Sequence, residues 1–324
     1  MTSAQRKANL LHATVKCTVD AVIQAGRDIR FFRFRPLDGE SLPPSDPGAH
    51  IGLLLPNGIV RQYSLMEPDM APDSYMIGVK RNPDGGGGSE WIHTELNSGD
   101  VIEIELPRNN FPMEEASAKN VLIAGGIGIT PIYAMAKAMH LQGRPFTLHY
   151  SCRSRDDAVL LEELAAFGDV RLHFDEERGG EFLSIDKIVQ ASDLDTHLYC
   201  CGPGPMLGAF EAACKDRPRS HVHLEYFQAK EAAARDGGFE IELARSGDVY
   251  WVEEGSTILD TLIQADVDVP YSCEEGICGA CEAKVLGGEP DHRDSYLSDE
   301  DRASGAMVLI CCSGSKSPRL ILDL

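Results

Sequence analysis

The sequence predicts a multidomain chain with an antiparallel β-barrel, a doubly wound α/β domain and a small α+β domain of β-grasp order. Short alternating runs broken by turn residues extend from Thr14 to about Leu106, as in a barrel. From Asn120 onward, unbroken apolar runs alternate with helical stretches, which indicates a parallel sheet. After Gly238 a hairpin, a helix, a cysteine-rich loop and three short strands follow. The expected boundaries are residues 1–115, 116–227, a polar linker at 228–237, and 238–324.

The composition indicates an acidic globular protein. The 324 residues include 30 Lys and Arg against 51 Asp and Glu, and the net charge of −21 disfavours nucleic acid and anionic membranes as partners. No apolar run approaches the about 20 residues that cross a bilayer. The N-terminus lacks the apolar core of an export signal, and ten cysteines in a chain of this size suggest reduced thiols. The sequence therefore predicts a cytoplasmic protein.

The expected barrel strands lie at residues 14–19, 29–35, 50–55, 75–80 and 101–106. A segment Arg61-Gln62-Tyr63-Ser64 lies between the third and fourth of them. After the fourth comes a loop with four glycines at positions 85–88, and Ser89 is the expected N-cap of a short helix whose first N–H groups favour an anion. A flexible surface hairpin is the alternative for this loop.

The α/β domain is expected to begin with a buried strand that ends in a glycine-rich turn. Residues 121–124 are apolar, and Gly125-Gly126-Ile127-Gly128-Ile129-Thr130-Pro131 leads into a helix. The glycines allow a dinucleotide pyrophosphate to approach the helix N-terminus, although the spacing is not the Rossmann G-x-G-x-x-G. Further strands are expected at residues 146–150, 170–174, 197–201 and 221–225, and a ligand is expected beyond their carboxyl ends.

The strongest chemical motif is Cys273-x4-Cys278-x2-Cys281. This spacing is typical of plant-type 2Fe-2S sites, in which thiolates hold two irons. A zinc ribbon is the alternative, but it would more naturally show two C-x2-C pairs. Gly276 and Gly279 favour the cluster, since the loop needs tight turns and backbone N–H groups directed toward sulfur.

The C-terminal segment resembles plant-type ferredoxins. In these proteins the last cysteine follows the third after 29 residues, which implies Cys311 as the fourth ligand. The adjacent Cys312 is expected to be a buried spare thiol, since neighbours on an extended strand point to opposite faces.

The barrel resembles the flavin domain of ferredoxin-reductase-like flavoproteins, which carry an R-x-Y-S segment. The resemblance implies that Arg61 binds the flavin phosphate, Tyr63 lies against the isoalloxazine ring and the Ser64 hydroxyl reaches flavin N5. An ordinary barrel strand is the alternative. Other flavin contacts are expected at Gln62, Val79, Lys80, Gly87, Gly88 and Ser89.

The second domain resembles the same reductases in its GG-x-G-x-TP turn and in Cys201-Gly202-Pro203-x-x-Met206. The resemblance places Cys201 near the nicotinamide, although a small residue at a tight strand end is the alternative. Phe227 is expected to shield the flavin or to belong to the core. The other expected nucleotide contacts are Gly125, Gly126, Ile127, Gly128, Thr130, Ser151, Arg153, Asp175, Gly202, Pro203 and Met206.

Two residues bear on the choice between NADH and NADPH. Asp175, at the end of the third strand, favours NADH because a carboxylate binds the ribose 2′-hydroxyl and repels a 2′-phosphate. Arg153 favours the opposite choice, so NADH is preferred and NADPH stays the alternative.

The domain order as a whole resembles the phthalate dioxygenase reductase family, which includes reductases of vanillate demethylases and other Rieske oxygenases. The resemblance implies FMN rather than FAD, a 2Fe-2S cluster and a Rieske oxygenase partner. Ser64, Tyr63 and Cys201 would place the reactants for hydride transfer, with no general acid or base required. The alternatives are the reductase of another multicomponent monooxygenase and a redox-sensing protein without turnover. The sequence leaves open the oxygenase substrate, the oligomeric state and the role of Cys312.

The acidic excess is concentrated near the C-terminus. From Gly238 onward there are six basic and eighteen acidic residues, a net charge of −12. Solubility alone explains such a surface. The second interpretation is an electrostatic steering face for the protein that accepts the electrons.

Overall fold

The computed structural model describes residues 13–83 and 85–324. The chain divides into two compact units. One contains Thr14–Leu55 and Arg61–Phe227, and the other contains Gln228–Leu324 with the short segment Pro56–Val60. Most of the N-terminal segment that bears on export lies outside the described residues.

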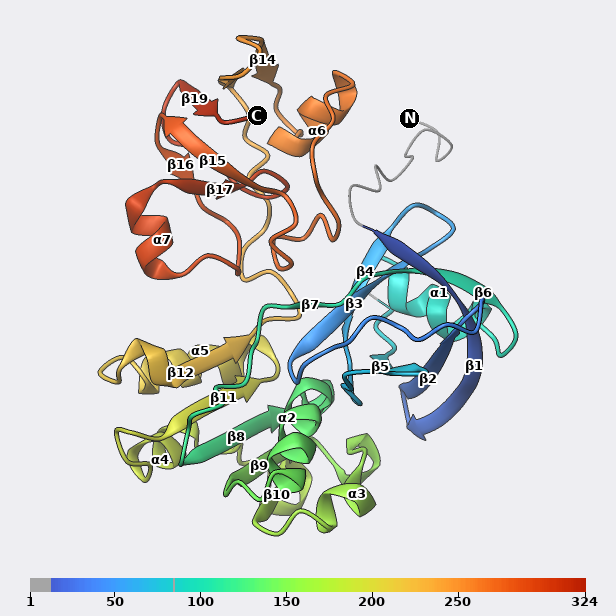
Figure 1. The fold of residues 1–324 in the computed structure, drawn as a ribbon. Helices are drawn as coiled ribbons and strands as arrows, with labels where there is room; N and C mark the ends of the chain where they lie inside the picture. The colour runs from blue at the N-terminus through green and yellow to red at the C-terminus, as the bar shows by residue number, and fades with distance from the viewer. Residues whose placement is uncertain (1–12, 84) are drawn as a thin grey trace. The chain divides into compact units, whose positions relative to one another are not determined.

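The first unit begins with the antiparallel barrel (Figure 1). Alternation explains its core, because Phe32 and Phe34 of β2 are fully buried while Arg33 and Arg35 are more exposed. The strands are β1 (Thr14–Gly26), β2 (Ile29–Pro36), β3 (Ala49–Leu54), β4 (Val60–Ser64), β5 (Tyr75–Lys80), β6 (Val101–Glu105) and β7 (Arg108–Asn109). They pair in the order β4-β3-β6-β1-β2-β5, with β7 on β3. The first strand is longer than predicted, since two register shifts keep it paired with β2 as far as Gly26.

The barrel carries one helix, α1 (Gly88–Glu95), at the glycine-rich loop. The prediction that Ser89 is its N-cap is wrong, because Gly87 takes that position with a φ of 82°, a left-handed conformation that suits glycine. Ser89 lies in the first turn, where its hydroxyl accepts a hydrogen bond from the Asn82 N–H at 3.1 Å. The hydroxyl therefore holds the loop closed at the start of the helix.

The rest of the first unit is the predicted doubly wound α/β domain. Its five strands pair in the order β10-β9-β8-β11-β12, and all four pairings are parallel. The strands are β8 (Asn120–Gly125), β9 (Thr147–Cys152), β10 (Val170–Phe174), β11 (His197–Cys201) and β12 (Val222–Glu225). The helices are α2 (Ile129–Leu141), α3 (Leu161–Ala165), α4 (Ile185–Gln190) and α5 (Gly204–Ala213), with 3₁₀ turns η1 (Gly126–Gly128), η2 (Arg155–Asp157), η3 (Asp175–Arg178) and η4 (Arg219–His221). The carboxyl ends of the strands meet at one edge of the sheet, where most of the predicted nucleotide contacts lie.

The second unit has the predicted α+β arrangement. One sheet has the order β14-β13-β19-β15-β17, and a small second sheet pairs β16 with β18. The strands are β13 (Phe239–Leu243), β14 (Val249–Val252), β15 (Glu282–Gly287), β16 (Pro290–Asp291), β17 (Met307–Leu309), β18 (Gly314–Ser315) and β19 (Arg319–Leu322). The helices are α6 (Ile258–Gln264) and α7 (Asp299–Ser304). A reciprocal capping box between Thr257 and Asp260 fixes the start of α6.

The segment 228–237, predicted as a linker, is hydrogen-bonded along the second unit. The Ala234 N–H donates to the Cys312 carbonyl at 2.7 Å, and the Arg235 carbonyl accepts from the Gly255 N–H at 2.7 Å. The Lys230 N–H donates to Ser295 Oγ at 2.9 Å. These contacts fix the segment on the domain that follows it.

No helix in the described part of the chain combines the length and the apolar character needed to cross a bilayer.

Candidate functional site

The four predicted metal-ligating cysteines converge in the second unit. Cys273, Cys278 and Cys281 lie in the loop between α6 and β15, and Cys311 follows β17. Each is at most 5% exposed. Burial of four thiols in a loop-rich region indicates a site for a thiophilic metal group.

The four thiols form two pairs. A hydrogen bond with Cys278 is the largest cause of the raised pKa of Cys273, and a hydrogen bond with Cys281 is the largest cause of the raised pKa of Cys311. A 2Fe-2S cluster needs two thiolates on each of two irons, whereas structural zinc gathers four ligands around one ion. The arrangement therefore fits the cluster, which Cys273, Cys278, Cys281 and Cys311 would hold through their thiolates.

The ligand loop depends on the two glycines singled out in the sequence. Gly276 and Gly279 have φ values of 70° and 76°. A Cβ atom at Gly276 would lie 2.5 Å from Cys312 Sγ, and one at Gly279 would lie 2.4 Å from the Tyr296 ring. The Glu275 N–H donates to Cys273 Sγ at 3.3 Å, so a backbone donor lies at the sulfur of a predicted ligand, as expected.

Cys312 is buried, but not for the predicted reason. Cys311 and Cys312 lie in a turn after β17 rather than on an extended strand. The chain reverses because the Ser313 N–H donates to the Leu309 carbonyl at 3.0 Å. Cys312 is 2% exposed and packs behind the ligand loop at Gly276, so it fills space between the two segments that carry the ligands.

In the first unit, Arg61 lies against the glycine-rich loop at the start of α1. A Cβ atom at Gly86 would lie 3.0 Å from Arg61 Nη2, and one at Gly88 would lie 2.9 Å from Arg61 Nε. The loop backbone thus approaches the guanidinium where the first N–H groups of α1 begin, with Gly87 and Ser89 beside it. A guanidinium and a helix N-terminus together form a cradle that fits a phosphate.

A buried carboxyl group that the sequence did not reveal lies beside Ser64. Glu225 ends β12, where it pairs with Cys201 of β11. The residue is partly exposed, but its carboxyl oxygen Oε2 is buried, and burial raises the pKa of Glu225 to about 8 against a smaller opposing effect of the Ser64 hydroxyl. Neither Ser64 Oγ nor Glu225 Oε2 has a hydrogen-bond partner of good geometry among the described residues. Unpaired buried polar atoms at a strand end fit a site that a flavin ring completes.

The signal for Glu225 was available in the sequence as an acidic residue directly before Tyr226-Phe227. Its chemical environment was not available, because Ser64 and Cys201 come from other strands. Burial, with a smaller contribution from Glu225, also raises the pKa of the fully buried Cys201 thiol. The thiol is therefore protonated near neutral pH.

The turns after β8 and β11 pack against each other. A Cβ atom at Gly128 would lie 2.3 Å from the Cys201 carbonyl oxygen, and one at Gly125 would lie 2.6 Å from Pro203 Cδ and 2.8 Å from Met206 Sδ. Only glycine permits this approach. The structure thus brings together the predicted contacts of both motifs, namely Gly125, Gly126, Ile127, Gly128, Thr130, Cys201, Gly202, Pro203 and Met206.

The corner expected to bind the adenosine ribose holds two ion pairs. Arg153 Nε lies 3.2 Å from Glu176 Oε1, and Arg155 Nε lies 2.6 Å from Glu177 Oε1. Ser151 is buried at the end of β9, and Asp175 lies 3.4 Å from His173 Nε2. The sequence singled out Arg153 and Asp175, but it did not reveal the two glutamates that balance the arginines.

The five remaining residues that were expected to contact or shield the flavin occupy varied environments. The Val79 side chain is buried in the barrel core, and Lys80, the last residue of β5, is exposed. Tyr63 is half-buried against the same core, whereas Phe227 packs on the core of the α/β domain. Gln62 Nε2 lies 3.4 Å from Glu105 Oε2. The roles of these residues in binding stay predictions.

Two family models match the chain. The oxidoreductase NAD-binding domain matches residues 122–212, and the 2Fe-2S iron-sulfur cluster binding domain matches residues 241–315. The second match agrees with the two thiol pairs and confirms the cluster over zinc.

Full-length relatives extend the match to the barrel. The chain is 49% identical over 313 residues to the phenoxybenzoate dioxygenase subunit beta of Ectopseudomonas oleovorans, which covers 96% of this chain and 98% of the relative. It is 45% identical over 319 residues to the tetrachlorobenzoquinone reductase of Sphingobium chlorophenolicum. This match covers 96% of this chain and 98% of the relative. The solved structure of phthalate dioxygenase reductase, described as a modular structure for electron transfer from pyridine nucleotides to 2Fe-2S, matches with a TM-score of 0.74 and 34% identity over 96% of this chain and 98% of that one. The chain therefore belongs to the phthalate dioxygenase reductase family, electron-transfer oxidoreductases that use NADH, FMN and a 2Fe-2S cluster.

Proposed function

We propose that this chain is the reductase component of a Rieske-type oxygenase that acts on an aromatic substrate in the cytoplasm. The observation that carries the proposal is a paired four-thiol site in the same chain as the flavin and NAD-binding folds. A relative named as a dioxygenase subunit spans nearly the whole chain, which supports an oxygenase as the electron acceptor. The ten free cysteines suit a reducing compartment.

FMN supplies the conversion between hydride transfer and single electrons when it is bound. Arg61 and the start of α1 would bind its phosphate, and Tyr63 would lie along its ring. Ser64 would place its hydroxyl at the reacting edge. Glu225 keeps its proton near neutral pH, so it can donate a hydrogen bond within this pocket. These groups hold and orient the reactants, and orientation is the main catalytic contribution expected for hydride transfer.

The edge of the parallel sheet would bind NADH. The glycine turn after β8 leaves room for the pyrophosphate at the start of α2, next to Thr130. Cys201, Pro203 and Met206 would support the nicotinamide from the neighbouring turn. Glu176 and Glu177 leave the ribose corner without excess positive charge, which favours a 2′-hydroxyl over a 2′-phosphate.

A second candidate function is direct reduction of a quinone. The specific observation in its favour is the 45% identity to a protein named tetrachlorobenzoquinone reductase. Purified reductase assayed with NADH and a chlorinated quinone, with and without an oxygenase, separates the two functions. Rapid quinone turnover together with failure to reduce any Rieske centre would favour the second candidate.

Replacing a cluster ligand tests the proposed electron route. In Cys278→Ser we expect NADH oxidation with a two-electron dye to continue near the wild-type rate, because the flavin and nucleotide sites are untouched. Reduction of cytochrome c is expected to fall to background, since it draws on the cluster. The control is Cys312→Ser, which should retain both activities because Cys311 is the proposed fourth ligand. Equal loss of both activities in a folded, FMN-loaded Cys278→Ser protein contradicts the route.

Ionic strength tests the acidic face. The second unit carries an exposed acidic turn at the start of α7, formed by Asp299, Glu300 and Asp301. If these charges steer docking, electron delivery to the oxygenase slows as the Debye length shrinks from about 10 Å at 0.1 M to about 3 Å at 1 M salt. Reduction of a small neutral quinone serves as the control and should not change. A constant delivery rate across this range argues against steering.

Replacing Glu225 tests its neutral state. The pKa rises from 4.5 to about 8 on folding, so the native state holds a proton that the unfolded state has lost. Stability from this group is therefore present below about pH 4.5 and is lost as pH rises toward 8, by at most about 1.4 kcal/mol per pH unit. Urea unfolding at several pH values should show a shallower decline for Glu225→Gln. The control Glu181→Gln, at an exposed position, should follow wild type. Identical slopes for Glu225→Gln and wild type refute this assignment.

Neutralising the two glutamates tests nucleotide choice. In Glu176→Gln/Glu177→Gln the partners of Arg153 and Arg155 lose their charge, so we expect kcat/KM for NADPH to rise about tenfold, or about 1.4 kcal/mol, with a smaller change for NADH. Calorimetric titration with 2′-phosphorylated and unphosphorylated AMP checks the same preference in binding. Asp193→Asn/Asp195→Asn, which removes two acidic charges from the partners of Lys119 at the amino end of the sheet, is the charge-matched control. No gain with NADPH excludes these glutamates as determinants.

A further inference from the structure

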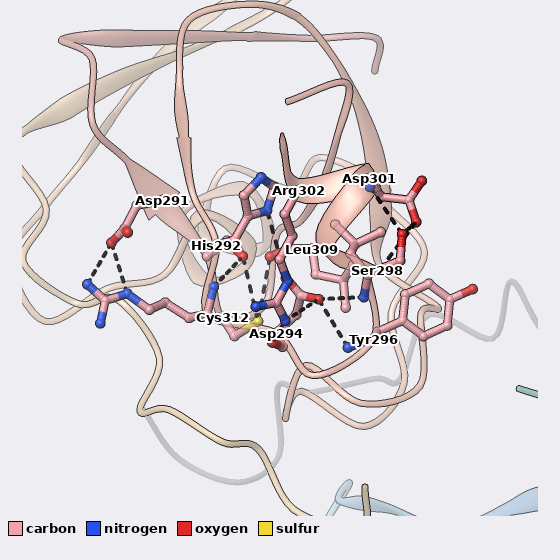
Figure 2. Close-up of polar contacts among 12 residues, drawn as sticks. Asp291, His292, Asp294, Tyr296, Ser298, Asp301, Arg302, Leu309 and Cys312 are labelled. Atoms are coloured by element: carbon pink, nitrogen blue, oxygen red, sulfur yellow. Dashed lines mark hydrogen bonds and ion pairs between the residues drawn. The ribbon is translucent and has the colours of Figure 1, made fainter. Parts of the chain in front are cut away.

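A buried carboxylate lies directly behind the cluster-ligand loop. Asp294 follows β16, and its side chain has no exposed surface. Its Oδ2 atom accepts hydrogen bonds from the Tyr296 N–H at 3.1 Å and the Leu297 N–H at 2.7 Å (Figure 2). Its Oδ1 atom has no hydrogen-bond partner among the described residues. A charged group in this position is poorly screened by solvent.

The turn around Asp294 is in contact with the ligand loop itself. A Cβ atom at Gly276 would lie 3.2 Å from Asp294 Cα. The Ser295 N–H donates to the Gly276 carbonyl at 2.9 Å. Gly276 lies between the predicted ligands Cys273 and Cys278 in the sequence, so the turn that carries Asp294 packs directly on the ligand loop.

Arg302 supplies the opposite charge. Its Nη2 atom lies 3.5 Å from Asp294 Oδ2 and also donates to the Asp294 carbonyl oxygen. The side chain is 24% exposed and extends from α7, whose start is fixed by a capping box between Ser298 and Asp301. Figure 2 shows the arginine reaching from this helix toward Asp294. The pair thus combines a closed hydrogen-bonded turn with two charges of opposite sign.

The other titratable groups nearby include His292, Glu282, Asp301 and Cys312. His292 Nδ1 lies 3.8 Å from Asp294 Oδ1, and burial lowers the pKa of His292, so the imidazole is neutral near pH 7. Glu282 follows the ligand Cys281, and burial raises its pKa, with smaller contributions from Asp301 and Asp294. Among these groups, Arg302 is the cation that faces Asp294.

We propose that the Asp294–Arg302 pair sets the reduction potential of the 2Fe-2S cluster. Reduction adds one electron, taken from the flavin and later passed to the acceptor, so the reduced cluster carries one more negative charge. A nearby buried carboxylate opposes that charge and lowers the potential, whereas the guanidinium favours it. With both residues present the two effects oppose each other. The reduction potential then lies between the value expected with the carboxylate alone and the value expected with the guanidinium alone.

At both positions a substitution can remove the charge and still keep a hydrogen-bonding group. Asn at position 294 keeps an acceptor oxygen for the Tyr296 and Leu297 N–H groups but removes the negative charge. Gln at position 302 keeps a donor but removes the positive charge, and Lys keeps the charge. If the two residues have only a structural role, Asp294→Asn and Arg302→Gln lose bound cluster, and their reduction potentials do not shift in opposite directions.

The test is an anaerobic redox titration of the full-length, cluster-loaded protein, followed by electron paramagnetic resonance. We expect the potential to rise in Asp294→Asn and to fall in Arg302→Gln. The double variant and Arg302→Lys should lie close to wild type. The matched control is Arg245→Gln, which removes one arginine from an exposed ion pair in the same unit, 3.0 Å from Asp323, and should leave the potential unchanged.

Unchanged potentials in the two single variants overturn the proposal, as do shifts of the same sign. Should Asp294→Asn fail to retain its cluster, the comparison of Arg302→Gln with Arg302→Lys decides. Equal potentials in those two proteins also overturn the proposal, because they differ chiefly in charge.

Discussion

The close packing of two ligand-bearing segments is the constraint on which the C-terminal unit depends. Cys311 must reach Cys281 from a different part of the chain, and Cys312 and Gly276 fill the space where the segments meet. Backbone hydrogen bonds of 2.7 to 2.9 Å join the surrounding segments. The Ser295 N–H donates to the Gly276 carbonyl and the Ala234 N–H donates to the Cys312 carbonyl. A side chain at position 276 would collide with Cys312 and with the backbone of Asp294. The segment 228–237 belongs to this packing even though its composition resembles that of a flexible linker.

Local patterns predicted most of the architecture. Alternation located the barrel strands, and unbroken apolar runs located the parallel sheet. The cysteine spacing predicted the metal centre, since ligand spacing reflects the loop itself. The errors have local causes as well. Gly87 replaced Ser89 as a helix cap because the chain turns there with positive φ, and a tight turn rather than a strand buries Cys312.

The residues that the sequence did not reveal are those defined by distant neighbours. Glu225 is one acidic residue among many until Ser64 of the barrel and Cys201 of the adjoining strand bury its carboxyl group. Asp294 likewise stands in a charged stretch with His292 and Arg293, and only the fold places its side chain behind Gly276. Arg153 was recognised, but its charge is balanced by Glu176 from the next strand end. Sequence gives the identity of such groups, whereas their charge state and partners follow from tertiary packing.

The two units manage buried carboxyl groups in opposite ways, and each way suits its chemistry. At Glu225 burial prevails and raises the pKa of the carboxyl group to about 8, so the proposed flavin pocket would gain a hydrogen-bond donor without an extra negative charge. Asp294 instead receives two backbone N–H groups and a guanidinium, which are the partners that a charged carboxylate requires. A neutral carboxyl group suits a pocket that binds an anionic nucleotide and in which a bound flavin would accept a hydride. A pair of opposite charges suits a centre that carries single electrons. The electric fields of the two charges largely cancel unless one partner is removed.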